Sequence, residues 1–280
     1  MRPNRAAQLR ELFAGKRIIT VVGAHDAMSA KLVEANGFDA IWASGFEIST
    51  SHAVPDASIL TMSELLDSTR GMTEAVSIPV IADCDSGFGE VRNAVHMVKK
   101  YEAADVAAIC IEDKRFPKLN SFVTGDQTLA AIDDFADKIR AAKAAQLSAD
   151  FMVIARIEAF IAGVGEEEAL RRAHAYADAG ADAILIHSKA KTADEVFGFA
   201  RKWNGRLPVV IVPTTYFTIS LADAAAAGIK MVIYANHGMR AAVRAIDETL
   251  AEIRRAGTTA PIESNIAPLK RLFELQGLKH

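Results

Sequence analysis

Eight short apolar runs, each followed by an alanine-rich amphipathic stretch, constrain the fold of this chain more than any other feature. Most runs are continuously apolar rather than alternating, which is typical of parallel strands covered on both faces. Their spacing is close to the roughly 30 residues of a strand–helix repeat. The runs cover residues 18–23, 40–45, 80–85, 107–113, 151–158, 183–188, 209–213 and 231–236.

This repeat predicts an α/β protein with a (β/α)8 barrel of the TIM type, although an open doubly wound sheet would share the pattern. The 280 residues are the usual length of one such barrel. We therefore predict a single domain over residues 1–280 with a C-terminal helical extension. The extension should contain helices over 240–256 and 265–276, the second packed either on a neighbouring subunit or on its own chain.

The composition excludes several classes of protein. The formal net charge is -3 with both signs interspersed, so no basic surface favours nucleic acid or an anionic membrane. No apolar stretch reaches the roughly 18 residues of a membrane span, and residues 1–17 do not resemble a secretory signal. Cys84 and Cys110 both lie in apolar runs, so we expect no disulfide and predict a cytoplasmic protein. Nucleotide-binding and zinc motifs are absent.

Polar residues close most of the predicted strands. Because the carboxyl ends of barrel strands meet at one mouth, we expect these side chains to form one site. The alternative is that strand ends are polar only because the chain meets solvent there. The residues concerned are Trp42, Ser44 and Gly45, Asp83 and Asp85, Glu112 and Asp113, Arg156 and Glu158, His187 and Ser188, and Asn236 and His237.

Two aspartates indicate a metal site. Asp83 and Asp85 are two positions apart, so on one strand they point to the same side, and Cys84 points towards the helices as a buried apolar residue. Together with Glu112 they form a set of hard oxygen ligands suited to Mg2+ or Mn2+. Salt bridges to Arg156 and Lys114 are the alternative.

The segment 112–122, EDKRFPKLNSF, is rich in hydrogen-bond donors. A polar loop of this kind above a barrel mouth often acts as a lid that excludes water, although a solvated surface loop is equally compatible with the sequence. Arg156 offers a planar fork that suits a phosphoryl or carboxylate group. His187 shares this rim, and the Ser44–Gly45 turn could present backbone N–H groups to an anion.

Six segments, in this order along the chain, resemble phosphoenolpyruvate mutase of the phosphoenolpyruvate mutase/isocitrate lyase superfamily. They are AIWASG (40–45), DCDSGFG (83–89), EDKRFPKLNS (112–121), ARIEAFIAG (155–163), GADAILIHSK (180–189) and VIYANH (232–237). The resemblance implies a (β/α)8 barrel whose eighth helix is swapped between subunits of a homodimer or homotetramer. It also implies an isomerase that interconverts phosphoenolpyruvate and phosphonopyruvate for phosphonate biosynthesis.

For the metal, the resemblance implies that Asp83 ligates Mg2+ directly while Asp56, Asp85 and Glu112 hold it through water.

For the substrate, it implies three groups of residues. The backbone N–H groups of Gly45 and Phe46 face the pyruvyl oxygens, beside Trp42. The phosphoryl group is held by Ser44, Asn120, Arg156 and His187, and the gating loop contains Lys118, Asn120 and Ser121.

Three other functions remain open. Phosphonopyruvate hydrolase shares the fold and metal site but carries threonine at the position of Asn120. Carbon–carbon lyases such as isocitrate lyase use a cysteine in the same loop, which here reads Leu119-Asn120. A non-catalytic barrel that binds an anionic metabolite is the third. Two departures from the mutase pattern are Phe46, where a leucine-like residue is expected, and the segment 122–128.

Overall fold

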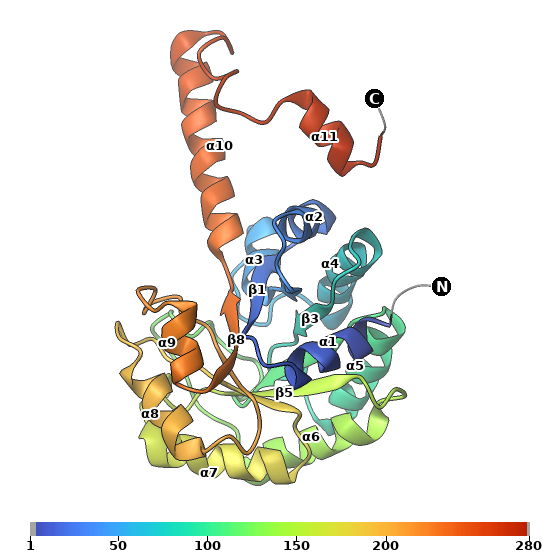
Figure 1. Ribbon diagram of the computed structural model, residues 1–280, viewed down its shortest axis with the longest axis vertical. Coiled ribbons are helices and arrows are strands. Elements are labelled where there is room, and N and C mark those ends of the chain that lie inside the picture. The colour runs from blue at the N-terminus through green and yellow to red at the C-terminus, as the bar shows by residue number, and fades with distance from the viewer. Residues whose placement is uncertain (1–3, 279–280) are drawn as a thin grey trace.

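A computed structural model describes residues 4–278, and in it all eight apolar runs form strands. The strands are parallel and pair in sequence order into a closed barrel, with β8 hydrogen-bonded to β1 (Figure 1). The (β/α)8 prediction is thus confirmed and the open sheet is wrong. The predicted domain, 1–280, includes residues 1–3 and 279–280, which lie outside the described residues. The strands are β1 Ile19–Ala24, β2 Ala40–Ala43, β3 Val80–Asp83, β4 Ala108–Glu112, β5 Met152–Ile157, β6 Ala183–Ile186, β7 Val209–Ile211 and β8 Ile229–Tyr234.

Helices follow the strands and cover the outside of the barrel. They are α2 Ala27–Ala35, α4 Met62–Ala75, α5 Val91–Ala103, α6 Ile132–Ala145, α7 Gly165–Asp178, α8 Asp194–Trp203 and α9 Leu221–Ala226. A further short helix, α3 Gly45–Ser51, begins directly after β2. Asp26, Thr61 and Ser220 form capping boxes that define the starts of α2, α4 and α9, satisfying backbone N–H groups that have no partner within the helix.

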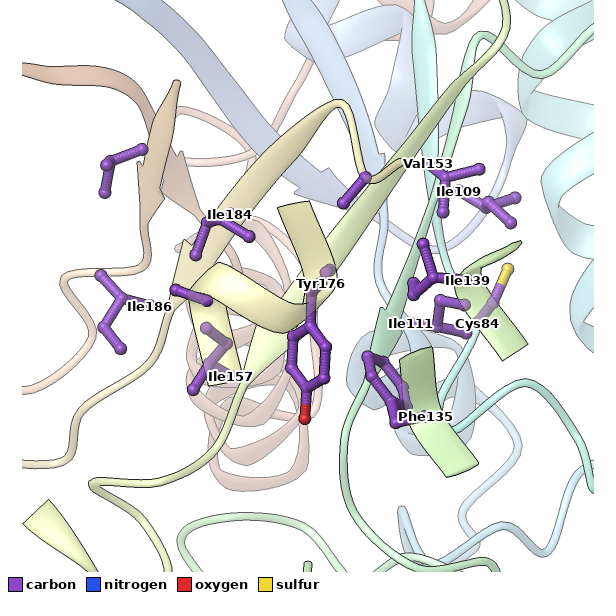
Figure 2. Packing of buried hydrophobic residues seen from close by; sticks show 14 of the residues in the cluster. Cys84, Ile109, Ile111, Phe135, Ile139, Val153, Ile157, Tyr176, Ile184 and Ile186 are labelled. Carbon is purple, nitrogen blue, oxygen red and sulfur yellow. The ribbon is translucent and has the colours of Figure 1, made fainter. Parts of the chain in front are cut away.

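The strands separate the hydrophobic barrel interior from the hydrophobic layer beneath the helices. Alternate side chains fill the barrel interior, among them Val21, Cys110 and Met231. The other side chains pack against the helices, where Cys84 lies near Ile111 and Ile139 (Figure 2). Cys84 is fully buried, which confirms its prediction as an apolar residue facing the helix layer.

The N-terminal helix α1, Arg5–Ala14, was not predicted from the sequence, and it closes one end of the barrel. Leu9 is fully buried and belongs to the interior core. Arg10 donates hydrogen bonds to the carbonyl oxygens of Asp150 and Phe151, at 3.0 and 3.1 Å, at the start of β5. The opposite end, where the strands have their carboxyl termini, is therefore the one available for a site.

Several strands end earlier than predicted. Asp85 does not share a strand with Asp83, because β3 ends at Asp83 and a turn follows, in which the Gly87 N–H donates to the Cys84 carbonyl at 2.8 Å. Asp85 itself adopts a left-handed conformation with φ 47°. Glu158 likewise lies just beyond β5. Asp85 and Glu158 thus follow the strands, whereas Asp83 and Glu112 occupy the last positions of β3 and β4.

The C-terminal extension also differs from the prediction. Helix α10, His237–Ala256, begins three residues earlier than expected, and α11, Leu269–Leu275, is shorter. Figure 1 shows α10 extending away from the barrel. Its only buried residue is Met239, so the eighth helix does not cover its own barrel.

The junction of β1 and β8 yields a stability prediction. A Cβ added at Gly23 would lie 2.2 Å from the carbonyl oxygen of Ala235, so Gly23→Ala should force the two strands apart. We expect a loss of about 1–3 kcal/mol in the free energy of unfolding, measured by urea denaturation. Gly71→Ala is the matched control, because Gly71 lies within α4 and has nothing within 4 Å of the added carbon. It should be neutral or stabilise by up to about 1 kcal/mol. Equal effects of the two changes would contradict this explanation.

Candidate active site

A cavity of about 640 Å3 opens at the carboxyl end of the barrel. It brings together 11 of the 13 residues to which the resemblance gave a role in binding metal or substrate. These are Trp42, Ser44, Phe46, Asp56, Asp83, Glu112, Lys118, Asn120, Ser121, Arg156 and His187. The other two adjoin its wall: a Cβ on Gly45 would lie 3.4 Å from Asp83 Oδ2 and 3.5 Å from Asp85 Oδ1.

The carboxylates at the cavity floor are poorly compensated. Glu112 Oε1 is buried and accepts no hydrogen bond, and the buried Asp85 Oδ1 lies 3.1 Å from Lys118 Nζ. Burial raises the pKa of the Asp83 carboxyl to about 7, although Arg156 and Lys118 oppose the shift. Within residues 4–278, no three His, Cys, Asp or Glu side chains converge closely enough to ligate one ion directly. The described residues thus do not form a preassembled set of three direct ligands.

Lys118 from the predicted lid reaches into this acidic region. Its Nζ lies 2.5 Å from Asp56 Oδ1 and 3.1 Å from Asp85 Oδ1. Burial alone would lower the pKa of Lys118, but Asp85 and Asp56 raise it above its ordinary value. Burial would raise the pKa of Asp56, yet Lys118 and Asn120 hold it below its ordinary value. The lysine and both aspartates are thus linked by charge.

Asn120 holds the segment 112–122 against the cavity through two hydrogen bonds to Asp56. Its backbone N–H donates to the carbonyl oxygen of Asp56 at 3.0 Å, and its side-chain Nδ2 donates to Asp56 Oδ2 at 2.7 Å. The Lys118 N–H donates to Ser58 Oγ at 3.1 Å. The segment therefore is not a solvated surface loop; it is hydrogen-bonded to the chain between α3 and α4. Phe122 extends this cover, with its ring edge-on to His187 at 5.8 Å.

Arg156 and His187 form the opposite wall of the cavity. Arg156 Nη2 lies 3.3 Å from Glu112 Oε2 and 2.9 Å from His187 Nδ1. The His187 Nδ1 also lies 2.7 Å from Glu158 Oε1. Burial lowers the pKa of His187, although Glu158 opposes the shift, so the ring is neutral at neutral pH. The arginine is accordingly the strongest anion-binding group on this wall.

The turn after β2 presents backbone amides. Ser44 is the N-cap of α3, and its Oγ accepts a hydrogen bond from the Glu47 N–H at 3.2 Å. Gly45 and Phe46 follow in the first turn, where N–H groups have no partner within the helix. Since Gly45 adjoins Asp83 and Asp85, these amides lie next to the carboxylates.

Asp113 and Glu158, buried beneath the cavity, were expected from the sequence only among the polar strand ends. Lys114 was expected only as an alternative salt-bridge partner of the carboxylates, and its Nζ lies 3.9 Å from Glu112 Oε1. Glu158 contacts Arg156 and His187, Lys114 contacts Ser121, and Asp113 accepts the Glu158 N–H at 2.8 Å. The alternation Arg156-Ile157-Glu158 was the available signal, because residues two apart at a strand end emerge on one side. Lys114 is almost fully buried, so it supports the lid rather than facing the cavity.

These features define a class of protein. A (β/α)8 barrel with a carboxylate cluster, an arginine and a covering loop at the carboxyl mouth is typical of an enzyme.

Comparison with known proteins specifies the family. A family profile described as phosphoenolpyruvate phosphomutase matches residues 9–254. The chain belongs to the phosphoenolpyruvate phosphomutase family, and the prediction that it is an enzyme of this family is confirmed.

Two curated relatives are similar over nearly their full length. Phosphonopyruvate hydrolase from Variovorax sp. is 50% identical and the match covers 96% of this chain and 93% of that protein. Phosphoenolpyruvate phosphomutase from Tetrahymena pyriformis is 44% identical, covering 98% and 92%.

Two solved structures agree with the fold. Phosphoenolpyruvate phosphomutase from Streptomyces platensis subsp. rosaceus has a TM-score of 0.96 at 55% identity, covering 97% of this chain and 95% of that one. A phosphonopyruvate hydrolase complex with oxalate and Mg2+ has a TM-score of 0.93 at 48% identity, covering 98% and 95%. Among the described residues, no helix is long and apolar enough to cross a membrane.

The charge link at Lys118 yields a pH-dependent prediction. Lys118→Met should cost about 3–5 kcal/mol of stability at neutral pH, because two buried carboxylates lose their partner. The folded pKa of Asp56 lies below its unfolded value, so its pairing stabilises the fold above about pH 4 and this contribution is lost as the pH falls further. The cost should therefore shrink towards acid pH.

The measurement is urea unfolding at several pH values in buffer that contains a chelator. Lys202→Met is the control, because Lys202 pairs with Glu166 at the exposed surface, where such pairs contribute about 0–1 kcal/mol. A cost for Lys118→Met that is independent of pH would exclude the charge link.

Proposed function

We propose that the protein interconverts phosphoenolpyruvate and phosphonopyruvate, forming or breaking a carbon–phosphorus bond, with Mg2+ as cofactor. The observation that carries this proposal is the position of Asn120, whose amide is held at the cavity by Asp56 within a fastened lid. The reaction transfers a phosphoryl group between an oxygen and a carbon of one pyruvate unit. It needs a site that orients the group and excludes water.

The donor set at the cavity floor fits a hard divalent cation. A buried Glu112 oxygen accepts no hydrogen bond, and burial, together with the nearby Asp85 and Glu112 carboxylates, raises the pKa of Asp83. Asp83 would ligate Mg2+ directly, with Asp56, Asp85 and Glu112 acting through water; Mn2+ suits the same oxygen set. A bound dication supplies electrostatic stabilisation of developing negative charge on the pyruvyl oxygens. The hydrolase complex with oxalate and Mg2+ supports this cofactor.

The residues around the cavity floor would bind the substrate and exclude water. The Gly45 and Phe46 amides would donate to the pyruvyl oxygens. Arg156 would grip the phosphoryl oxygens with its planar fork, beside Ser44, His187 and Asn120. Trp42 would pack against the substrate. The lid residues Lys118, Asn120 and Ser121 would exclude water while the phosphoryl group is between partners.

Phosphonopyruvate hydrolase is the second candidate, because the Variovorax enzyme is 50% identical. Overall identity does not separate the two activities, since the most similar structure above is a phosphomutase at 55%. The residue at position 120 favours the mutase, because an asparagine amide reaches Asp56 across the cavity edge. Threonine would offer a shorter hydroxyl and leave room for water.

A carbon–carbon lyase has less support. Lyases of this superfamily use a cysteine acid in the loop, whereas Cys84 and Cys110 are both buried away from the cavity lining. A silent binding barrel is also disfavoured, because burying this many carboxylates destabilises the fold without a compensating use.

The mutase proposal predicts how Asn120 variants behave. Asn120→Ala should reduce mutase turnover by roughly 10²-fold or more, since an orienting contact of the phosphoryl group is lost. Asn120→Thr should divert part of the flux to pyruvate and phosphate. Phosphorus NMR of purified enzyme with phosphonopyruvate and Mg2+ measures both outcomes, together with a coupled assay for pyruvate. Thr124→Ala, at an exposed position of the neighbouring loop, is the control and should behave like the unchanged enzyme.

Free phosphate as the main product of the unchanged enzyme would replace the mutase proposal with the hydrolase. Full activity of Asn120→Ala would exclude the role given to the lid.

The cofactor proposal predicts a metal requirement. A chelator should abolish turnover, and Mg2+ should restore it. Asp83→Ala should lose Mg2+-dependent thermal stabilisation, which a ligand bound to the folded state otherwise provides. The control is Asp150→Ala, at the opposite end of the barrel, which should keep the stabilisation by Mg2+. Turnover in excess chelator would refute the requirement.

We also propose that the chain assembles into a homodimer or homotetramer in which α10 packs on a partner's barrel. Its Val243, Ile246 and Leu250 are each more than half exposed, and they lie three or four residues apart on one face. Val243→Glu with Ile246→Glu should shift the protein to monomer in analytical ultracentrifugation. The control Arg244→Glu alters the charged side of the helix and should leave assembly unchanged. An unmodified protein that is monomeric at micromolar concentration would disprove the assembly.

A further inference from the structure

The carboxylate of Glu158 has four partners, which divide between its two oxygens. Oε1 accepts a hydrogen bond from Arg156 Nε at 2.5 Å and lies 2.7 Å from His187 Nδ1. Oε2 accepts a hydrogen bond from Ser121 Oγ at 2.6 Å and lies 3.3 Å from Lys114 Nζ. One oxygen thus holds the wall of the cavity, and the other holds the lid.

Glu158 does not line the cavity and is fully buried beneath it. It therefore acts only through its partners. We infer that Glu158 is a positioning residue that couples the lid to the anion-binding wall, so that Arg156 and His187 reach their working orientation when Ser121 is in place. This inference rests on the proposed function, because that function gives the wall and the lid their roles.

The carboxylate has little freedom to move. The Glu158 N–H donates to Asp113 Oδ1 at 2.8 Å, and Asp113 Oδ2 in turn accepts hydrogen bonds from Arg172 and Tyr176 at 2.9 and 2.8 Å. This anchors the residue to α7. Burial would raise the pKa of Glu158, but Arg156 and His187 hold it well below its ordinary value, so the group stays ionised. The lid must therefore come to the carboxylate, rather than the reverse.

The lid side of the link is also well defined. Lys114 Nζ donates to Ser121 Oγ at 2.7 Å and to the Leu119 carbonyl at 2.8 Å. Ser121 Oγ also lies 3.3 Å from Arg156 Nη2. Displacement of Ser121 would remove one acceptor from Lys114 and one donor from Glu158 together. Such shared hydrogen bonds make the lid and the wall energetically dependent on each other.

Glu158→Gln tests the inference, because it keeps the volume but removes the charge and one acceptor. We expect kcat to fall about 10–100-fold, the size typical of losing an orienting partner. The fraction of product released as phosphate should rise, and hydrogen exchange of residues 114–128 should quicken in the free enzyme. Glu158→Asp, which keeps the charge, should recover part of kcat. Glu102→Gln is the control: Glu102 accepts two backbone N–H groups far from the cavity, and its loss should change none of these.

A second variant approaches the link from the lid. Ser121→Ala should also quicken exchange of the lid and raise the phosphate fraction, and its cost should not add to that of Glu158→Gln in the double variant. If Glu158→Gln does not fold, Ser121→Ala alone tests the link: normal lid exchange and an unchanged phosphate fraction in this variant would overturn the inference. Normal lid exchange in both single variants, or additive losses in kcat, would overturn the inference. If the unchanged enzyme acts on neither substrate, the proposed function fails, while the exchange data still test the coupling.

Discussion

Burial of negative charge at one end of the barrel is the constraint on which the rest of the site depends. Five carboxylates, from Asp56, Asp83, Asp85, Glu112 and Glu158, lie among three buried cations, from Lys114, Lys118 and Arg156. Water cannot solvate these groups, so each needs a partner of opposite charge. The segment after β4 provides both lysines, β5 provides the arginine, and the remaining imbalance is of the kind that a bound dication would offset.

Much of the fold was predictable from local pattern, and the reasons are specific. Continuous apolar runs such as those around Ile81 and Ile154 are typical of parallel strands with both faces covered, and eight strand–helix repeats favour a barrel. Helix α1 was missed because its buried residues, Arg5, Ala6 and Leu9, form too short a stripe to stand out. The left-handed turn at Asp85 was missed because a positive φ is uncommon at any residue other than glycine, so the sequence gives little reason to expect it.

The charged residues at the strand ends of the candidate site could be predicted from the sequence, because each follows an apolar run. Asp83, Arg156 and His187 follow apolar runs, and the barrel topology brings such positions together. The support beneath them was not predictable in this way. Glu158 meets Ser121 across 37 positions of chain, and Asp113 meets Tyr176 across 63, so only the folded arrangement reveals the connection. A few such distant contacts decide how the cavity residues are held.

The two cysteines occupy opposite sides of the barrel wall, Cys110 in the interior core and Cys84 in the layer beneath the helices. Burial raises the pKa of both thiols well above the ordinary range, so neither forms an appreciable thiolate at neutral pH. A thiol-specific reagent can therefore modify them only when the packing around them opens. Without any introduced label, the chain thus has one thiol on each side of the barrel wall whose reaction rate reports the opening of the packing around it. The order in which they react would reveal whether the helices leave the barrel before the strands separate.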